Sequence, residues 1–235
     1  MAAFDRNATK FDDFLLAQLS EAERERLEPL FEPVDLPAKM VLCRIGKPIE
    51  YAVFPATAIT STLVEMPEGD SMEVGIMGSE GVVGLDLLYD ARESSTKVVV
   101  QVAGVGSRVK AEDFTREIVG RTELYKILLR YSRAFTGMIA QSGACNATHV
   151  IEQRLARWLL MVHDRVHHDR FDLTHEYMAL MLGVRRAGVS GAANHLRLCG
   201  AIDYTRGSVK IMDREALEAC ACGCYAIIRR LFDAT

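Results

Sequence analysis

The chain has 235 residues, of which 49% are hydrophobic and 26% are charged, and its formal net charge is −4. This length favours two modest domains or one large one, and the composition excludes a disordered or low-complexity chain. No apolar run approaches the roughly 20 residues of a transmembrane helix, and the first ten residues contain no apolar signal core. The sequence therefore predicts a cytoplasmic protein without a membrane partner.

The charge is unevenly divided along the chain. Residues 1–149 carry a net charge of −6, whereas residues 150–235 carry +2. Such an asymmetry suggests an acidic module joined to a module that tolerates polyanions. The overall acidity therefore does not exclude binding to a nucleic acid.

The first half of the chain predicts one short helix followed by strands. Ser20 and Glu23 form a capping box that opens a helix over Glu21–Glu28, and the prolines that follow end it. Between Met40 and Val109, short runs rich in β-branched or aromatic residues alternate with turns. The predicted strands are Val41–Ile45, Tyr51–Phe54, Ile59–Val64, Met72–Ile76, Val98–Val102 and Ser107–Val109. Their spacing indicates an antiparallel sandwich, barrel or roll.

From Glu123 the apolar residues follow a heptad pattern over about three heptads. The a and d positions are Leu124, Leu128, Tyr131, Phe135, Met138, Ser142 and Cys145. This alternation of four and three is typical of a helix that packs on a parallel partner helix, so it predicts a dimer seam. The alternative is one amphipathic helix buried on its own domain. Cys145 on this seam leaves an intersubunit disulfide open.

The last third of the chain has the most specific order of elements. After a helix that begins near Ile151, Thr174 caps a helix over His175–Leu182, and Gly183 separates it from a second helix over about 185–198. A small hairpin follows, with Arg206 at its tip, and a final helix is predicted to extend from residue 214 to about 232. Two helices joined by a glycine turn and followed by a hairpin indicate a winged helix-turn-helix.

The second of these helices has two distinct faces. Its small apolar residues share one side and are expected to pack inward. Arg186, Ser190, Asn194 and Arg197 share the other side at spacings of three and four. Arginine can read guanine and asparagine can read adenine in the major groove. Thr174, Arg185 and Arg206 are placed to contact phosphates. For any one residue a solvated surface charge is the alternative, but the combination favours DNA binding.

The order of these elements resembles the Crp/Fnr superfamily of bacterial transcription regulators over residues 20–232. The strongest resemblance lies in Leu173–Arg186, which reads LTHEYMALMLGVRR, and in Gly188-Val189-Ser190; the segment Glu152–Leu159 is also similar. The resemblance implies an α+β fold with an N-terminal antiparallel β-roll of the cyclic-nucleotide-binding type, a long dimerisation helix and a C-terminal winged helix-turn-helix domain. The corresponding divisions are 1–120, 121–148 and 149–235.

The resemblance also implies partners. These are double-stranded DNA with a pseudo-palindromic operator, a second copy of the chain, and an unknown small-molecule effector, and RNA polymerase stays open as a further partner. In the family, a Gly-Glu pair and a later Arg-Ser/Thr-Ala triplet hold a cyclic nucleotide. The corresponding positions here are Gly84, Leu85, Ser95, Thr96 and Lys97. Since the glutamate and the arginine are replaced, the sequence predicts an effector other than cyclic AMP, or none.

Metal and haem ligands are sparse in the first half of the chain, where Cys43 is the only cysteine before Cys145 and no histidine precedes His149. Iron–sulfur members of the family use a cysteine cluster near the N-terminus, which is missing here. Cys220, Cys222 and Cys224 would not all meet on one continuous helix, so we interpret them as small buried residues. The sequence predicts no cofactor and no metal.

These observations predict a dimeric, sequence-specific DNA-binding transcription regulator. A cyclic-nucleotide-responsive regulator of the same architecture is the first alternative. The second is a signalling scaffold or enzyme that uses the roll without binding DNA. No nucleophile–base pair or phosphate loop is present in the sequence, so we predict that the protein is not an enzyme.

Overall fold

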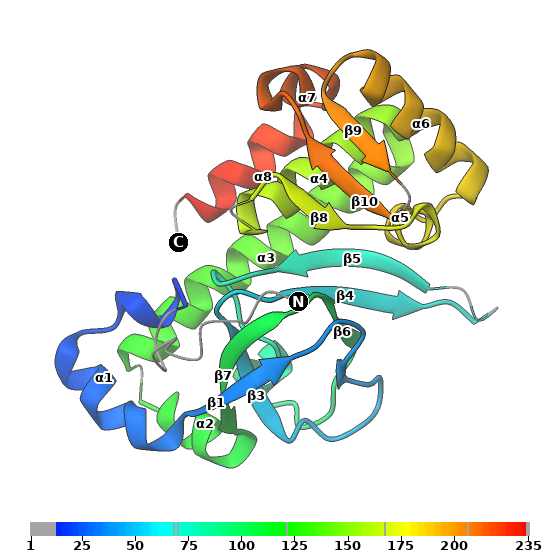
Figure 1. Cartoon of the computed structure of the whole chain (residues 1–235). Coiled ribbons are helices and arrows are strands. Elements are labelled where there is room, and N and C mark those ends of the chain that lie inside the picture. The colour runs from blue at the N-terminus through cyan, green and yellow to red at the C-terminus, as the bar shows by residue number, and fades with distance from the viewer. Residues whose placement is uncertain are drawn as a thin grey trace. The chain divides into compact units, whose positions relative to one another are not determined.

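A computed structural model describes residues 13–233 except 68, 70, 121, 167 and 206. The chain divides into two compact units (Figure 1). The first comprises the residues up to Thr62 together with Met77–Ala134, and the second comprises Leu63–Ile76 and the residues from Phe135 onward. The division into residues 1–120, 121–148 and 149–235 describes function rather than packing and stays a prediction. Among the described residues, no helix combines the length and the hydropathy needed to cross a membrane.

The N-terminal part begins with a short helix, α1, over Glu21–Leu27, flanked by the 3-10 turns Leu16–Gln18 and Glu28–Leu30. The Ser20 hydroxyl accepts a hydrogen bond from the backbone N–H of Glu23 at 3.4 Å, which confirms the predicted cap. Seven strands follow: β1 (Glu32–Leu36), β2 (Val41–Cys43), β3 (Tyr51–Pro55), β4 (Ile59–Glu65), β5 (Ser71–Met77), β6 (Lys97–Val102) and β7 (Gly104–Lys110). A 3-10 turn, η3 (Leu85–Tyr89), precedes β6, and α2 (Ala111–Glu117) follows β7.

These strands form two sheets, in the orders β1-β7-β3 and β2-β6-β4-β5. Strand β7 pairs antiparallel with β1 and β3, and β2 pairs antiparallel with β6. Strand β1 differs from the sequence prediction, which has no strand at residues 32–36. Proline disfavours a strand, but β1 lies at a sheet edge, where Pro33 needs no donor on its outer side. The rings of Phe31, Phe54 and Phe114 pack in the core of this unit in tilted pairs, with centroids 5.4 and 6.2 Å apart.

The C-terminal part begins within the 26-residue helix α3 (Glu123–Thr148) and continues with α4 (Ile151–Val166). The later elements are β8 (Arg170–Asp172), α5 (His175–Leu182), α6 (Arg186–Leu198), β9 (Ile202–Thr205), β10 (Ser208–Ile211), α7 (Arg214–Cys220) and α8 (Cys224–Phe232). Helix α4 packs against α5, α6, α7 and α8, so it forms the centre of this unit (Figure 1). Its face includes the fully buried Leu155, Leu159 and Val162.

Two details of this region differ from the sequence prediction. The hairpin β9–β10 is extended by β8 into a three-stranded antiparallel sheet in the order β8-β10-β9. The final helix, expected to be continuous from residue 214 to 232, is two helices. Helix α7 ends at Cys220, where Ala221 adopts an extended conformation (φ −81°, ψ 156°), and α8 starts again at Cys224. This break changes the direction of the cysteine side chains.

Candidate nucleic-acid interface

Helices α5 and α6 are joined by a tight turn. The Thr174 hydroxyl caps α5 by accepting the Tyr177 N–H at 3.1 Å. Gly183 ends the helix with φ +60°, a conformation that glycine adopts without the steric penalty of a Cβ. Arg185 is then the extended N-cap residue of α6. The chain therefore makes the helix–turn–helix that the sequence predicts.

Helix α6 separates its residues into two faces as predicted. Its buried residues are Val189, Ala192, Ala193 and Leu196. The residues expected to meet DNA are all exposed: Arg185, Arg186, Ser190, Asn194 and Arg197. We call these five exposed residues the recognition face. Thr174, predicted to contact phosphate, is also exposed, whereas Arg206 lies outside the described residues. Their contact with DNA stays a prediction.

Short hydrogen bonds orient the side chains of the recognition face. The Arg197 guanidinium donates to Asn194 Oδ1 at 3.1 Å. The Ser190 hydroxyl lies 3.2 Å from the carbonyl of Arg186, to which it donates, and 3.0 Å from Nδ1 of His175. Asn194 and Ser190 are thus held by neighbouring groups, and Arg186 is exposed beside them.

His175 makes contacts that sequence reasoning did not anticipate. It lies at the start of α5, where its ring stacks on Tyr204 of β9, with centroids 4.2 Å apart and an interplanar angle of 21°. It also contacts Ser190 of α6, so one side chain joins both helices and the hairpin strand. Burial, and secondarily the charge of Arg186, lower the pKa of His175 below its usual value. No local pattern reveals this role, because Tyr204 is distant in sequence.

Arg154 of α4 stabilises the end of α5, next to the turn at Gly183. Its side chain is 7% exposed, and its guanidinium donates to the carbonyl of Leu182 and to Oδ1 of Asn146. Leu182 is the last residue of α5, so its carbonyl is one of those that a helix end leaves without a partner. Burial lowers the pKa of Arg154 below that of a solvated arginine. Arg154 therefore fixes the end of α5 relative to α4.

The hairpin lies beside the N-cap of α5. The Leu173 N–H donates to the Gly207 carbonyl at 2.8 Å, and Gly207 has φ +81°.

A Cβ on Gly188 of α6 would lie 3.0 Å from Ile151, so Gly188 faces α4. Gly188 is therefore on the packed side of α6. A Cβ on Gly191 would meet nothing within 4 Å, so Gly191 is on the open side of the same helix.

The heptad stripe of α3 is covered by the chain itself. Leu124, Leu128, Tyr131, Phe135, Met138, Ser142 and Cys145 are each between 0% and 8% exposed in the single chain. Phe135 lies against Gly75, Tyr131 against Gly81, and Ser142 accepts a hydrogen bond from Arg157. Their burial in the single chain favours the alternative that the sequence left open, in which they form the inner face of the helix, and their assignment to a seam with a partner stays an untested prediction.

The predicted effector positions lie at the start of η3 and at the start of β6. Gly84 is the N-cap of η3 with φ +92°, and Leu85 is the first residue of that turn. The Ser95 hydroxyl donates to Oδ1 of Asp86 at 2.7 Å. Thr96 and Lys97 are half-buried nearby in sequence. Ser95, which the sequence analysis aligns with the family's phosphate-binding arginine, therefore faces a carboxylate.

A separate cavity of about 430 Å³ lies in the roll. Its walls include Tyr51, Leu87, Arg92, Lys110 and Glu112. None of the five predicted effector residues lines it. The structure therefore does not bring the predicted positions together around this cavity.

Comparison with known proteins agrees with this geometry. Residues 153–220 match the family model of the Crp-like helix-turn-helix domain. The C-terminal region is therefore similar to Crp-like helix-turn-helix domains. The matched residues include α5, the turn, α6 and the hairpin described above. No curated protein matches the chain.

Solved structures share the fold of about four fifths of the chain at low identity. FixK2 from Bradyrhizobium japonicum has a TM-score of 0.70 and 14% identity, covering 82% of this chain and 98% of its own. A CRP-family transcriptional regulator from Thermus thermophilus has a TM-score of 0.66 and 18% identity, covering 80% and 96%. The c-di-GMP-responsive global regulator CLP from Xanthomonas campestris has a TM-score of 0.66 and 14% identity, covering 83% and 100%. The α+β architecture predicted from the Crp/Fnr resemblance is confirmed.

Proposed function

We propose that this protein is a dimeric, sequence-specific DNA-binding transcription regulator that acts in the cytoplasm. The observation that carries the proposal is the recognition face, a row of exposed polar and basic side chains on α6 within a Crp-like helix-turn-helix domain. Arg186, Ser190 and Asn194 are placed to read base edges, and Arg185 and Thr174 to contact phosphates. Arg206 is assigned to the flanking backbone on sequence grounds.

In this proposal, the DNA-binding unit is a dimer of two copies of the chain. In the single chain, α3 leaves Leu129, Thr136, Ala140 and Gly143 exposed at spacings of seven, four and three. Such a stripe suits a partner helix, because its small residues allow close approach. We therefore place the dimer contact on this face. Two recognition helices related by a dyad would enter major grooves about 34 Å apart on a pseudo-palindromic site.

The effector is not cyclic AMP in this proposal. A cyclic phosphate needs a cation or several directed donors. Ser95 occupies the arginine position, and the Asp86 carboxylate beside it repels an anion. Calorimetry with cyclic AMP and cyclic GMP tests this point directly, and saturable heat with either would contradict it.

The proposed function is tested by selecting bound DNA from a random-sequence pool with purified protein and no added ligand. We expect a two-fold symmetric consensus whose half-sites lie about one helical turn apart. Crosslinking or sedimentation of the free protein measures the dimer. A Leu129→Glu variant that stays fully dimeric would place the contact elsewhere. A pool without enrichment, repeated with cell extract and again without enrichment, would overturn DNA reading.

A further inference from the structure

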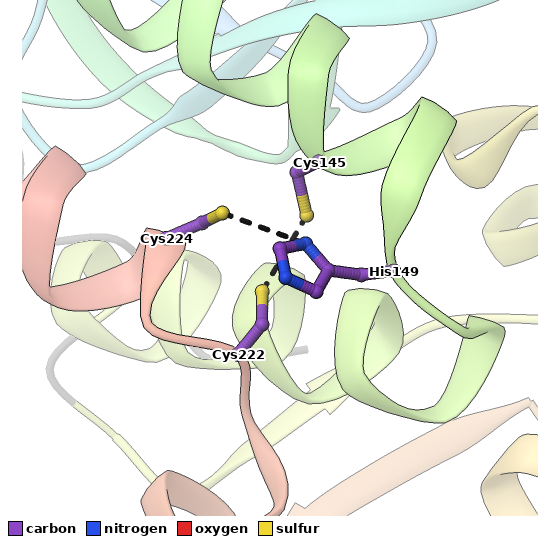
Figure 2. A group of neighbouring side chains, drawn as sticks. All are labelled: Cys145, His149, Cys222 and Cys224. Atoms are coloured by element: carbon purple, nitrogen blue, oxygen red, sulfur yellow. Dashed lines mark hydrogen bonds between the residues drawn. The ribbon is translucent and has the colours of Figure 1, made fainter.

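Four side chains of the C-terminal unit converge on one point (Figure 2). They are Cys145, near the end of α3, His149, in the link to α4, and Cys222 and Cys224, at the break between α7 and α8. We call this group the Cys–His cluster. The three cysteines are 0%, 5% and 4% exposed, and all are free thiols. The cluster combines residues far apart in the chain, which meet because the final helix breaks at Ala221.

The spacing within the cluster fits a single tetrahedral metal ion. The Sγ atoms of Cys145 and Cys222 are 3.5 Å apart, and Sγ of Cys224 lies 3.6 Å from Nδ1 of His149. All four donor atoms lie within 4.8 Å of one another. With Zn–S bonds of about 2.3 Å and Zn–N bonds of about 2.0 Å, the edges of a tetrahedral site are about 3.8 Å between sulfurs and about 3.5 Å between sulfur and nitrogen.

Polar groups surround the sulfur atoms, although burial raises the pKa of the Cys222 thiol to about 12. Gln141 donates its side-chain N–H to Sγ of Cys224 at 3.1 Å, and the backbone N–H of Cys224 donates to the Cys222 sulfur. Cys224 is also the first residue of α8, where the helix dipole stabilises negative charge. The Arg154 guanidinium interacts electrostatically with Cys145. Hydrogen bonds to sulfur and a nearby cation are the environment expected around metal-bound thiolates.

We propose that the Cys–His cluster binds one Zn²⁺ ion in a closed Cys₃His site. On binding, each of the three thiols releases its proton to solvent, and His149 coordinates as neutral imidazole. Four protein ligands leave no open position, which is the arrangement of structural rather than catalytic zinc. An iron–sulfur cluster does not fit, because its cysteines bind different iron atoms and therefore stand farther apart than these donors. The assignment departs from the sequence-based expectation of small buried residues.

Bound zinc would fasten two parts of the C-terminal unit to each other. Cys145 and His149 are one helical turn apart, with the His149 N–H bonded to the Cys145 carbonyl at 3.0 Å. They belong to the turn where α3 gives way to α4. Cys222 and Cys224 belong to the link that sets the direction of α8. The ion therefore joins the α3–α4 turn to the α7–α8 link, and this role does not depend on the proposed DNA binding.

The test is metal analysis of the purified full-length protein by inductively coupled plasma mass spectrometry. We expect about one zinc per chain. Replacement with Co²⁺ is expected to give thiolate-to-cobalt charge-transfer absorption and the intense visible bands of tetrahedral cobalt. The Cys222→Ser and Cys224→Ser variants should each reduce the zinc content by on the order of tenfold. His149→Ala should reduce it likewise, whereas His149→Cys, which restores a fourth ligand, should retain it.

The matched control is Cys199→Ser. Cys199 is exposed at the end of α6 and belongs to a second group of donors, with His195 and Cys220, that offers only three ligands. This variant is expected to keep the zinc and the cobalt spectrum. Loss of zinc in Cys199→Ser with retention in Cys222→Ser would overturn the proposal. So would iron in place of zinc, or a metal-free protein whose intact mass shows a Cys145–Cys222 disulfide.

Discussion

The recognition face of α6 and the Cys–His cluster lie in the same unit, but they present their polar groups in opposite ways. The recognition face consists of exposed side chains, of which Ser190, Asn194 and Arg197 form hydrogen bonds with close neighbours in the sequence or with α5. The cluster consists of buried donors from three separate segments that point toward one position. An exposed surface such as the recognition face is folded without DNA, so substitutions there should change the stability of the protein little. A buried cluster of donors such as the Cys–His cluster should depend on its metal ion for stability.

The largest expected effect is on the free energy of unfolding, and it should differ between the buried and the exposed face of α6. Leu196 is fully buried, so Leu196→Ala is expected to lower the free energy of unfolding by about 2–5 kcal/mol. Asn194→Ala, two residues away on the exposed side, should change it by less than about 0.5 kcal/mol. Urea denaturation followed by circular dichroism measures both. Equal losses for the two variants would show that the recognition face is part of the core.

Removal of the proposed metal ion should lower the stability of the folded protein and leave the recognition face of α6 unchanged. A ligand present at a thousandfold excess over its Kd stabilises the folded state by about 4 kcal/mol, and a chelator removes that contribution. We therefore expect a strong metal chelator to lower the Tm of the wild-type protein. Cys222→Ser should begin with a lower Tm and show no response to the chelator. A wild-type Tm that is insensitive to chelator and to added ZnCl₂ would contradict this expectation.

Substitution on the recognition face should change DNA binding and leave stability unchanged. Arg186→Ala is expected to cost about 1–3 kcal/mol of binding free energy at the selected site and to relax the preference at one base pair. Arg185→Ala should weaken binding to all sequences alike, because a phosphate contact carries no base information. Fluorescence anisotropy with matched and mismatched duplexes separates the two patterns. Unchanged binding by Arg186→Ala would show that α6 does not read bases as assigned.

The smallest expected effect is a pH dependence from His175. Its pKa is lowered in the folded protein, so the unfolded chain takes up the proton first as the pH falls. The stabilising contribution of neutral His175 is therefore present above the ordinary pKa of about 6.5 and is lost as the pH falls from there through the folded-state pKa. His175→Phe keeps an aromatic ring against Tyr204 and cannot ionise. A His175→Phe variant with the wild-type slope of unfolding free energy against pH would contradict this assignment.

The sequence predicts the recognition face well because the information is local. A helical period of 3.6 residues determines which side chains of α6 share a side, and Gly183 marks the turn. The same reasoning identifies the stripe of α3 but not what covers it. Gly75 and Gly81 provide the space for Phe135 and Tyr131, and nothing in the α3 sequence indicates those contacts.

The Cys–His cluster, in contrast, could not be predicted from the sequence. Cys145 and Cys222 are 77 positions apart, and their meeting depends on the packing of α3 against the end of the chain. A continuous final helix would direct Cys222 away from Cys220 and Cys224, as the sequence analysis assumes. The break at Ala221 is not marked by proline. Only the folded arrangement places Cys222 and Cys224 beside Cys145 and His149.

The stack between His175 and Tyr204 has a consequence for the operator. Because the His175 ring contacts both α6 and β9, the helix that we propose reads bases and the hairpin would be held at a fixed separation along a bound duplex. Each base pair advances the duplex axis by about 3.4 Å. A single base pair inserted between the step read by α6 and the phosphates beneath the hairpin would therefore move one of the two contacts out of reach. We therefore expect the spacing between these two contacts within a half-site to vary less than the base sequence of the half-site.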